Sequence, residues 1–252
     1  MTEVVRRLPP EHPLHRFLAD EVHARPPVYV PNPGCAACVA LLRGVGGSVE
    51  DELAALRALT SEADAKAASP DPRRRHVVLQ LSDARVKWER HSEFSSYSII
   101  RALDAAHADA TIWPPSAFGA VPPDWLAGLP GQTIAAVDVV LLPARHKGPL
   151  IEWATHLFPA STLIGSQVAG GVAQVYSDFQ LGVDGRERWV VFDAGMTRGQ
   201  QARIVQRLTE IAIYRVMALL AFPVARDLAA PLSHAEERLS EVTARIAGPG
   251  TW

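Results

Sequence analysis

Apolar residues recur along the chain with two periods, and the change of period separates predicted strands from predicted helices. Runs rich in β-branched and aromatic residues predict strands over 35–42, 76–81, 86–100, 133–142, 172–181 and 188–192. Spacings of three and four predict helices over 12–23, 49–63, 124–129, 150–158 and 200–222. Pro223 breaks or kinks this last helix, and a further helix runs to about residue 246. The segment 162–171 fits neither period.

These elements predict an α+β fold built on a mixed, largely antiparallel sheet. The run 133–142 is almost entirely apolar, which is typical of a central strand. A strand, a helix and a strand pair occur in that order over 37–100 and again over 133–193, so we expect two similar halves. Residues 1–198 are expected to form the sheet domain, with residues 199–252 as helices packed on it in one compact unit.

One stretch, 86–100, carries an unusual row of ionisable residues. If the stretch forms a single strand, alternate side chains share a face. One face then carries Lys87, Glu89, His91 and Glu93 in succession, and Arg90 lies on the other face. Four ionisable groups in a row on an inner strand predict a polar site or a buried polar network.

Two further polar groups are candidates to join this row. The predicted N-terminal helix ends in Glu21, His23 and Arg25, just before a proline. The long helix after residue 200 has a polar stripe, whose spacings of four, three and four place it on one face: Arg203, Arg207, Glu210 and Tyr214. Packing of this helix on the sheet would bring the stripe opposite the polar row.

A convergent cluster of this kind admits several roles. In a structural network, the stripe arginines neutralise Glu89 and Glu93, and Glu210 pairs with Lys87 or Arg90. Alternatively, Lys87 and the stripe arginines bind a small anionic ligand. The cluster could also fix the interface of a homo-oligomer. We therefore expect a ligand-binding or interaction module, and a scaffold without any ligand stays open.

The alternative is an enzyme. His91 with Glu89 or Glu93 would suit general acid–base work. His91, one carboxylate and His23 would supply ligands that zinc or manganese accepts, although this signal is weak. The sequence assigns no catalytic residue, no metal and no cofactor.

Composition narrows the class of protein. The chain has 252 residues, 48% hydrophobic and 21% charged, which is an ordinary globular balance. Its net charge of -2 argues against a nucleic-acid partner. We find neither a secretory signal nor a run of the roughly 18 apolar residues needed to span a bilayer, so we expect a cytoplasmic protein. Cys35 and Cys38 lead into a strand and form no four-ligand set, which indicates two small buried residues.

At the three polar clusters the chain resembles a bacterial family of predicted membrane-anchored proteins of unknown function. The matching segments are 12–14 with 21–26, then 87–94, then 205–208 with 210–211 and 214–215. In that family a further helical region and a hydrophobic anchor follow, so the chain resembles the N-terminal soluble portion, as a truncated or a naturally short member. The resemblance implies a head domain beside the inner face of a membrane, with no established activity.

Overall fold

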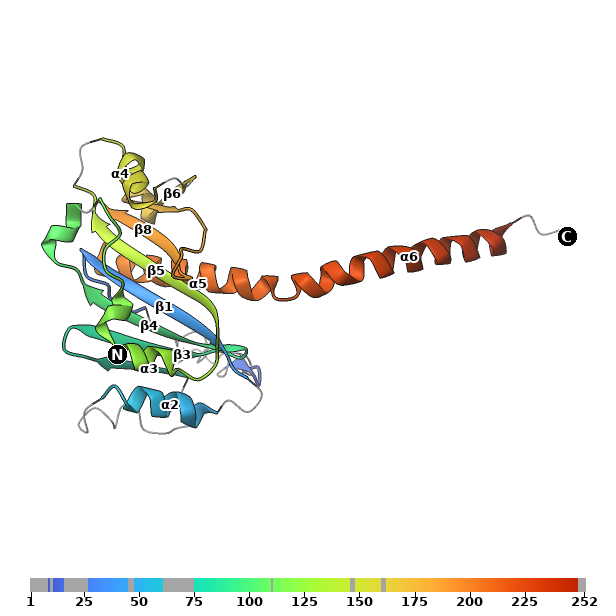
Figure 1. Cartoon of the computed structure of the whole chain (residues 1–252), viewed down its shortest axis with the longest axis horizontal. Coiled ribbons are helices and arrows are strands. Elements are labelled where there is room, and N and C mark those ends of the chain that lie inside the picture. Colours follow the sequence, from blue (N-terminus) through green and yellow to red (C-terminus); the bar gives the residue numbers. More distant parts are fainter. Residues whose placement is uncertain are drawn as a thin grey trace.

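The computed structural model describes residues 9, 11–15, 27–44, 48–60, 75–109, 111–145, 148–159 and 162–248. The predicted helix over 12–23 and the cluster of Glu21, His23 and Arg25 therefore lie largely or wholly outside the described residues. The rest is an α+β fold in which one eight-stranded mixed sheet is flanked by helices (Figure 1), as the sequence predicted.

The described elements follow the predicted order. The strands are β1 Gly34–Leu42, β2 His76–Gln80, β3 Ala84–Arg90, β4 Phe94–Ala102, β5 Gln132–Pro143, β6 Ile164–Val168, β7 Ala173–Ser177 and β8 Glu187–Asp193. The helices are α2 Val49–Arg57, α3 Pro123–Ala127, α4 Leu150–Leu157, α5 Arg198–Leu219 and α6 Phe222–Ala247, with 3-10 turns at Ala105–Asp109, Ala117–Ala120 and Ala169–Gly171. The ambiguous segment 162–171 thus supplies β6.

The sheet consists of two halves with the same strand order. Its order is β2-β3-β4-β1-β5-β8-β7-β6, so in each half the first strand lies at the centre and the last strand lies beside it. Each half contains one strand more than predicted. The halves differ in one respect, because β1 pairs with β4 antiparallel whereas β5 pairs with β8 parallel.

The prediction of a single strand over 86–100 is wrong. The chain forms a hairpin of β3 and β4, in which Glu89 lies opposite Ser96. The amide of His91 donates to the carbonyl of Phe94 at 2.8 Å and closes a tight turn. Residue preference could not locate this turn, because the strand-forming residues on its two sides read as one run. Consequently Glu93 lies in the exposed turn instead of continuing the polar row.

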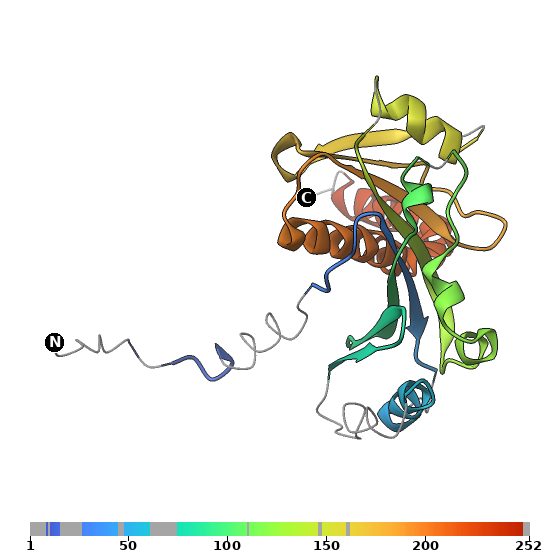
Figure 2. The ribbon, with the colours of Figure 1, turned by 90° about the vertical axis from the view of Figure 1, so that its left-hand side faces the viewer.

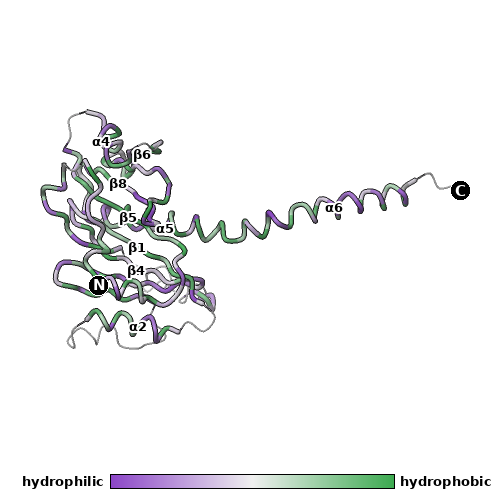
Figure 3. Tube along the Cα trace, in the orientation of Figure 1, coloured by the Kyte–Doolittle hydropathy of each residue, from purple (hydrophilic) through white to green (hydrophobic). Residues whose placement is uncertain are grey.

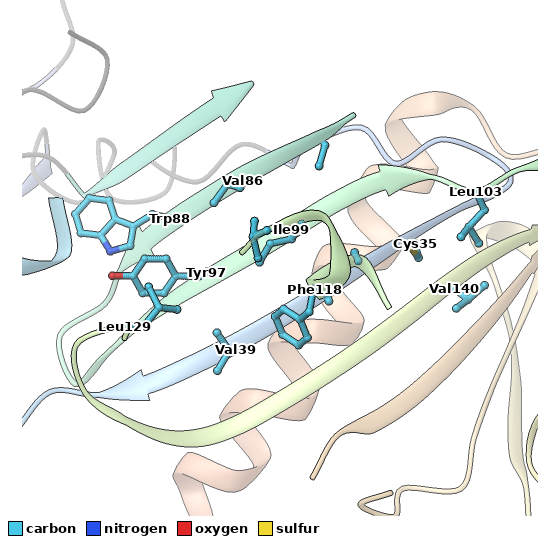
Figure 4. Close-up of a cluster of buried hydrophobic side chains, with 14 of the residues drawn as sticks. Cys35, Val39, Val86, Trp88, Tyr97, Ile99, Leu103, Phe118, Leu129 and Val140 are labelled. Atoms are coloured by element: carbon cyan, nitrogen blue, oxygen red, sulfur yellow. The ribbon is translucent and has the colours of Figure 1, made fainter. Parts of the chain in front are cut away.

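One face of the sheet packs against α2, α4 and the segment around the second 3-10 turn. Trp88 and Tyr97 are fully buried there, beside Phe118 and Leu129 (Figure 4). Helix α2 begins with a capping box, in which the Ser48 side chain accepts from the amide three residues later. The apolar cluster on this face is the largest of the three in the described part of the chain.

The opposite face packs against α5 (Figure 2). Val205, Leu208 and Ala212 of this helix lie on a second apolar cluster that includes Val139 and Val191. The side chains of α5 that fill the core therefore lie in the start and middle of the helix. The helix begins at a capping box formed by Thr197 and Gln200.

Helix α6 leaves the sheet and extends far from it (Figure 1). All of its side chains from Phe222 to Ile246 are exposed. The α5–α6 segment, Arg198–Ile246, is the one described helix whose length and composition would allow it to cross a bilayer, and 22% of its most apolar window is buried. Thus α5 belongs to the core, whereas α6 is an arm.

The end of β8 is tied to the start of α5 by Asp193. Its Oδ1 accepts from the amides of Gly195 at 2.8 Å and Met196 at 2.6 Å. Its Oδ2 accepts from the side chains of Asn32 at 2.9 Å and Gln201 at 2.7 Å. Burial by itself raises the pKa of Asp193, but the four hydrogen bonds outweigh burial and the pKa is lowered.

We expect Asp193→Asn to flatten the acid dependence of stability. Because the folded-state pKa is lowered, the ionised carboxylate stabilises the fold above the unfolded pKa of about 3.9. This contribution is lost as the pH falls through the folded value. Urea unfolding between pH 7 and pH 3 should show a smaller loss of stability for the variant than for the wild type. Equal slopes would contradict the assignment.

Candidate functional site

A buried ion pair lies on the sheet face that packs against α5. Lys87 Nζ and Glu89 Oε1 of β3 are 2.8 Å apart, and their side chains are only 4% and 11% exposed. Next to Lys87 across the sheet come Ser98 of β4 and Cys38 of β1, which share the same row of paired residues. Since an unpaired buried charge is costly, the pairing is what allows these two residues to lie here.

Helix α5 completes this polar layer. The hydroxyl of Tyr214 lies 3.0 Å from Nδ1 of His91 in a hydrogen bond whose donor depends on the tautomer of the imidazole. His91 stacks on Phe94 at 4.1 Å between ring centroids, and Tyr214 meets the same ring edge-on at 5.6 Å. The loop after β3 is thereby joined to the last third of α5.

The thiol of Cys38 responds electrostatically to the surrounding charges. Burial raises its pKa to about 12, and the carboxylates of Glu89 and Glu210 add to the rise. A hydrogen bond with Ser98 and the charge of Lys87 oppose it. Groups from β1, β3, β4 and α5 are therefore close enough to interact, and the thiol stays protonated at neutral pH.

A second charged contact, which the sequence did not predict, holds the last third of α5. Arg215 forms an ion pair with the buried Glu187 of β8. Glu187 also accepts from the indole of Trp189 at 2.8 Å, and the Arg215 guanidinium lies 4.8 Å from the ring centroid of Phe179. A signal existed in the sequence, because Glu187 begins a strand whose next alternate residues, 189 and 191, are apolar.

Of the predicted site residues, the structure pairs Lys87 with Glu89 and His91 with Tyr214, and Glu210 lies near enough to Cys38 to raise the pKa of its thiol. Arg203 and Arg207 lie on the exposed side of α5. Arg90 ends β3 on the opposite face, and Glu93 accepts from the hydroxyl of Ser92 in the exposed turn. The remaining three, Glu21, His23 and Arg25, lie outside the described residues.

This arrangement suits the holding of a helix better than the binding of a small ligand. Lys87 and Glu89 neutralise one another, so the pair offers no net charge to an anion. Among the described residues, no group of three or more His, Cys, Asp or Glu side chains is placed to hold a metal ion. His91 contacts Tyr214 and Phe94, both of which also contact each other. The cluster fixes the position of α5 on the sheet.

Another buried carboxylate lies on the far face of the sheet. Asp138 of β5 accepts from Ser116 Oγ at 2.6 Å and lies 3.1 Å from Nε of Arg186. Burial raises its pKa, against the opposing effects of Ser116, Arg186 and Arg188. The sequence reading treated 133–142 as an apolar strand, although a lone aspartate in such a run was a visible signal of a buried polar contact.

Together, the fold and these contacts define a sheet protein with a helix anchored by buried polar pairs and continued as an exposed arm. The chain belongs to the family described as "Protein of unknown function (DUF3422)", whose model matches residues 10–251. The family resemblance in the sequence is thus confirmed at the level of a family of unknown function. Neither the curated proteins nor the solved structures contained a match.

We expect Lys87→Met to destabilise the protein strongly, by about 3–5 kcal/mol, because it leaves Glu89 charged and unpaired in the interior. The double variant Lys87→Met/Glu89→Met removes both charges at similar volume and should recover most of that loss. Urea unfolding of the two variants measures the difference. A double variant as unstable as the single one would show that the ion pair is not the origin of the effect.

We expect Tyr214→Phe to cost about 1 kcal/mol of unfolding free energy, since it removes one hydrogen bond and keeps the ring. The same substitution in a His91→Phe background should cost almost nothing, because the partner is already gone. This double-mutant cycle isolates the pair. Equal costs in both backgrounds would mean that the hydroxyl acts elsewhere.

Proposed function

We propose that the protein is a helix-binding interaction module. The sheet and α5 form its base, and α6 carries its binding surface. The observation that supports this proposal is the exposed apolar side of α6, which no described part of the chain covers. Contiguous exposed apolar surface on a soluble protein generally marks a site of association.

Although the exposed Phe222 and Val224 lie off it, a row of eight exposed apolar residues runs with regular spacing from the residue before α6 along the helix. From residue 221 to residue 246 they recur at alternating intervals of four and three, as in a coiled coil. We call this row the seam: Ala221, Ala225, Leu228, Leu232, Ala235, Leu239, Val242 and Ile246. Figure 3 shows apolar and polar segments alternating along the arm. A narrow row of this kind fits the seam of another helix rather than the broad face of a sheet.

The stability of α6 also favours a bound partner. Pro231 lies inside the helix, where it removes one hydrogen bond and crowds the preceding turn. An isolated helix of this length is only marginally stable in water, and most helical stability comes from packing of the apolar side. Contacts along the seam would supply the missing stabilisation.

The charges of α6 favour a protein partner over a lipid surface. Helices that lie on membranes usually carry a strongly basic polar face. Between residues 222 and 247, α6 instead has three arginines and four acidic residues, and these charges interrupt its apolar segments. A position of the protein beside a membrane, as the resemblance implies, is compatible with this role, because the arm would bind a helix in either place.

The base supports this proposal by giving α6 a defined direction. Contacts with the buried His91 and Glu187 hold α5 on the sheet at Tyr214 and Arg215, less than two turns before the helix ends at Leu219. Only Leu220 and Ala221 separate α5 from α6. A short connection of this kind transmits the orientation of α5 to the arm.

Amide hydrogen exchange of the full chain tests the proposal. If the seam is bound to another helix, amides over 228–246 should exchange at least about tenfold more slowly in the wild type than in Leu232→Glu/Leu239→Glu. The matched control Ser233→Glu/Ser240→Glu adds the same charges one residue away from the seam and should exchange like the wild type. Equally fast exchange of this segment in all three proteins would contradict the proposal.

A further inference from the structure

We infer that the partner of α6 is the α6 of a second copy of this chain, and that the two helices run antiparallel. This inference rests on the proposed function, since it names the occupant of the seam. It is carried by three features of the arm: the sizes of the seam residues, the charges beside the seam, and the carbonyl group left free by Pro231.

The sizes of the seam residues are complementary when two copies are opposed. In an antiparallel pair, each residue faces the residue at the same distance from the other end of the seam. Ala221 then faces Ile246, and Ala225 faces Val242. Both of these layers combine a large residue with a small one.

The central layers follow the same rule. Leu232 faces Ala235 of the other copy, and Leu228 faces Leu239. In a parallel, in-register pair the same residues would face themselves, so Ala221, Ala225 and Ala235 would form three all-alanine layers. Layers of uniformly small residues leave gaps, whereas layers that combine large and small residues fill the space between two helices.

The charges that flank the seam also favour the antiparallel pair. Arg238 lies beside the seam, and Asp227 of the other copy lies one position farther out on the same side, within two residues or roughly 3 Å along the axis, so that the long Arg238 side chain can bridge the two. The symmetry of the pair repeats this contact, which gives two opposite-charge pairs per dimer. In a parallel pair, a residue beside the seam lies close to the residue five positions later in the other copy. For Arg238 that residue is Thr243, so no charge pair forms there.

Pro231 fits the same arrangement. Because proline has no amide hydrogen, the carbonyl of Asp227 loses its usual donor four residues later. Arg238 of the other copy carries several N–H donors at this level, and Arg is suited to serving a carbonyl and a carboxylate together. In a pair of arms, the carbonyl of Asp227 can therefore accept a hydrogen bond from the other copy, whereas in an isolated α6 it can accept one only from water.

The mass of the purified full chain in solution, measured by light scattering over a dilution series, tests self-association. We expect two chains per particle. Leu232→Glu/Leu239→Glu should raise the dissociation constant by at least ~100-fold, because it buries four charges in the seam of the dimer. The outer-face control Ser233→Glu/Ser240→Glu should change it by less than about threefold. A wild-type chain that stays monomeric up to about 100 µM, or that binds phosphatidylcholine–phosphatidylglycerol vesicles as a monomer, overturns the inference.

Disulfide trapping tests the direction. The native Cys35 and Cys38 are buried and free, so they do not interfere. A mixture of Leu232→Cys chains and Ala235→Cys chains should give the mixed disulfide, with little product from either variant alone. Disulfides within each variant alone would show a parallel pair and overturn the inference, while the proposed helix-binding function would stand. The helix-binding function itself would be contradicted by a different result, namely amide exchange over 228–246 that is equally fast in the wild type and in the seam variant.

Discussion

The placement of α5 on the sheet depends on polar contacts between the last third of the helix and buried polar groups of the sheet. Arg215 of α5 pairs with the buried Glu187 of β8, and Tyr214 of α5, which stays half exposed, pairs with the buried His91, while Lys87 and Glu89 of β3 neutralise each other on the same sheet face. Apolar contacts alone would allow a helix to slide or rotate at modest cost, whereas displacement of α5 would take Arg215 from the buried Glu187 and Tyr214 from the buried His91. We therefore regard the pairs as the source of a defined orientation rather than of net stability.

Most of the fold could be predicted because its elements have clear local patterns. The apolar run of β5 and the helical spacings of α2, α4 and α5 all sit where the sequence indicates. The hairpin of β3 and β4 was missed, since His91-Ser92-Glu93 contains no glycine or proline to signal a turn. The parallel pairing of β5 with β8 is set by tertiary packing, which local patterns do not encode.

The candidate site was only partly predictable, for a related reason. Helical spacing placed Glu210 and Tyr214 on one face, and they do reach the polar strand. The same spacing grouped them with Arg203 and Arg207, which lie where the helix no longer faces the sheet's polar rows. Which turn of a helix meets which strand depends on the crossing angle, and that angle depends on side chains from the whole interface. Arg215 and Glu187 became visible as partners only in the fold.

Polar contacts hold α5 on the sheet, whereas the arm α6 exposes an apolar seam, and this difference has a geometric consequence. An α6 of 26 residues is roughly 39 Å long. If two arms pair antiparallel along their full length, the two sheet domains lie at opposite ends and are kept apart by about that distance. The domains then contribute little to association, so the seam residues must supply nearly all of it. Because the anchor fixes each arm relative to its own sheet, the pair would hold the two sheets at a set spacing and orientation, which loosely attached arms could not do.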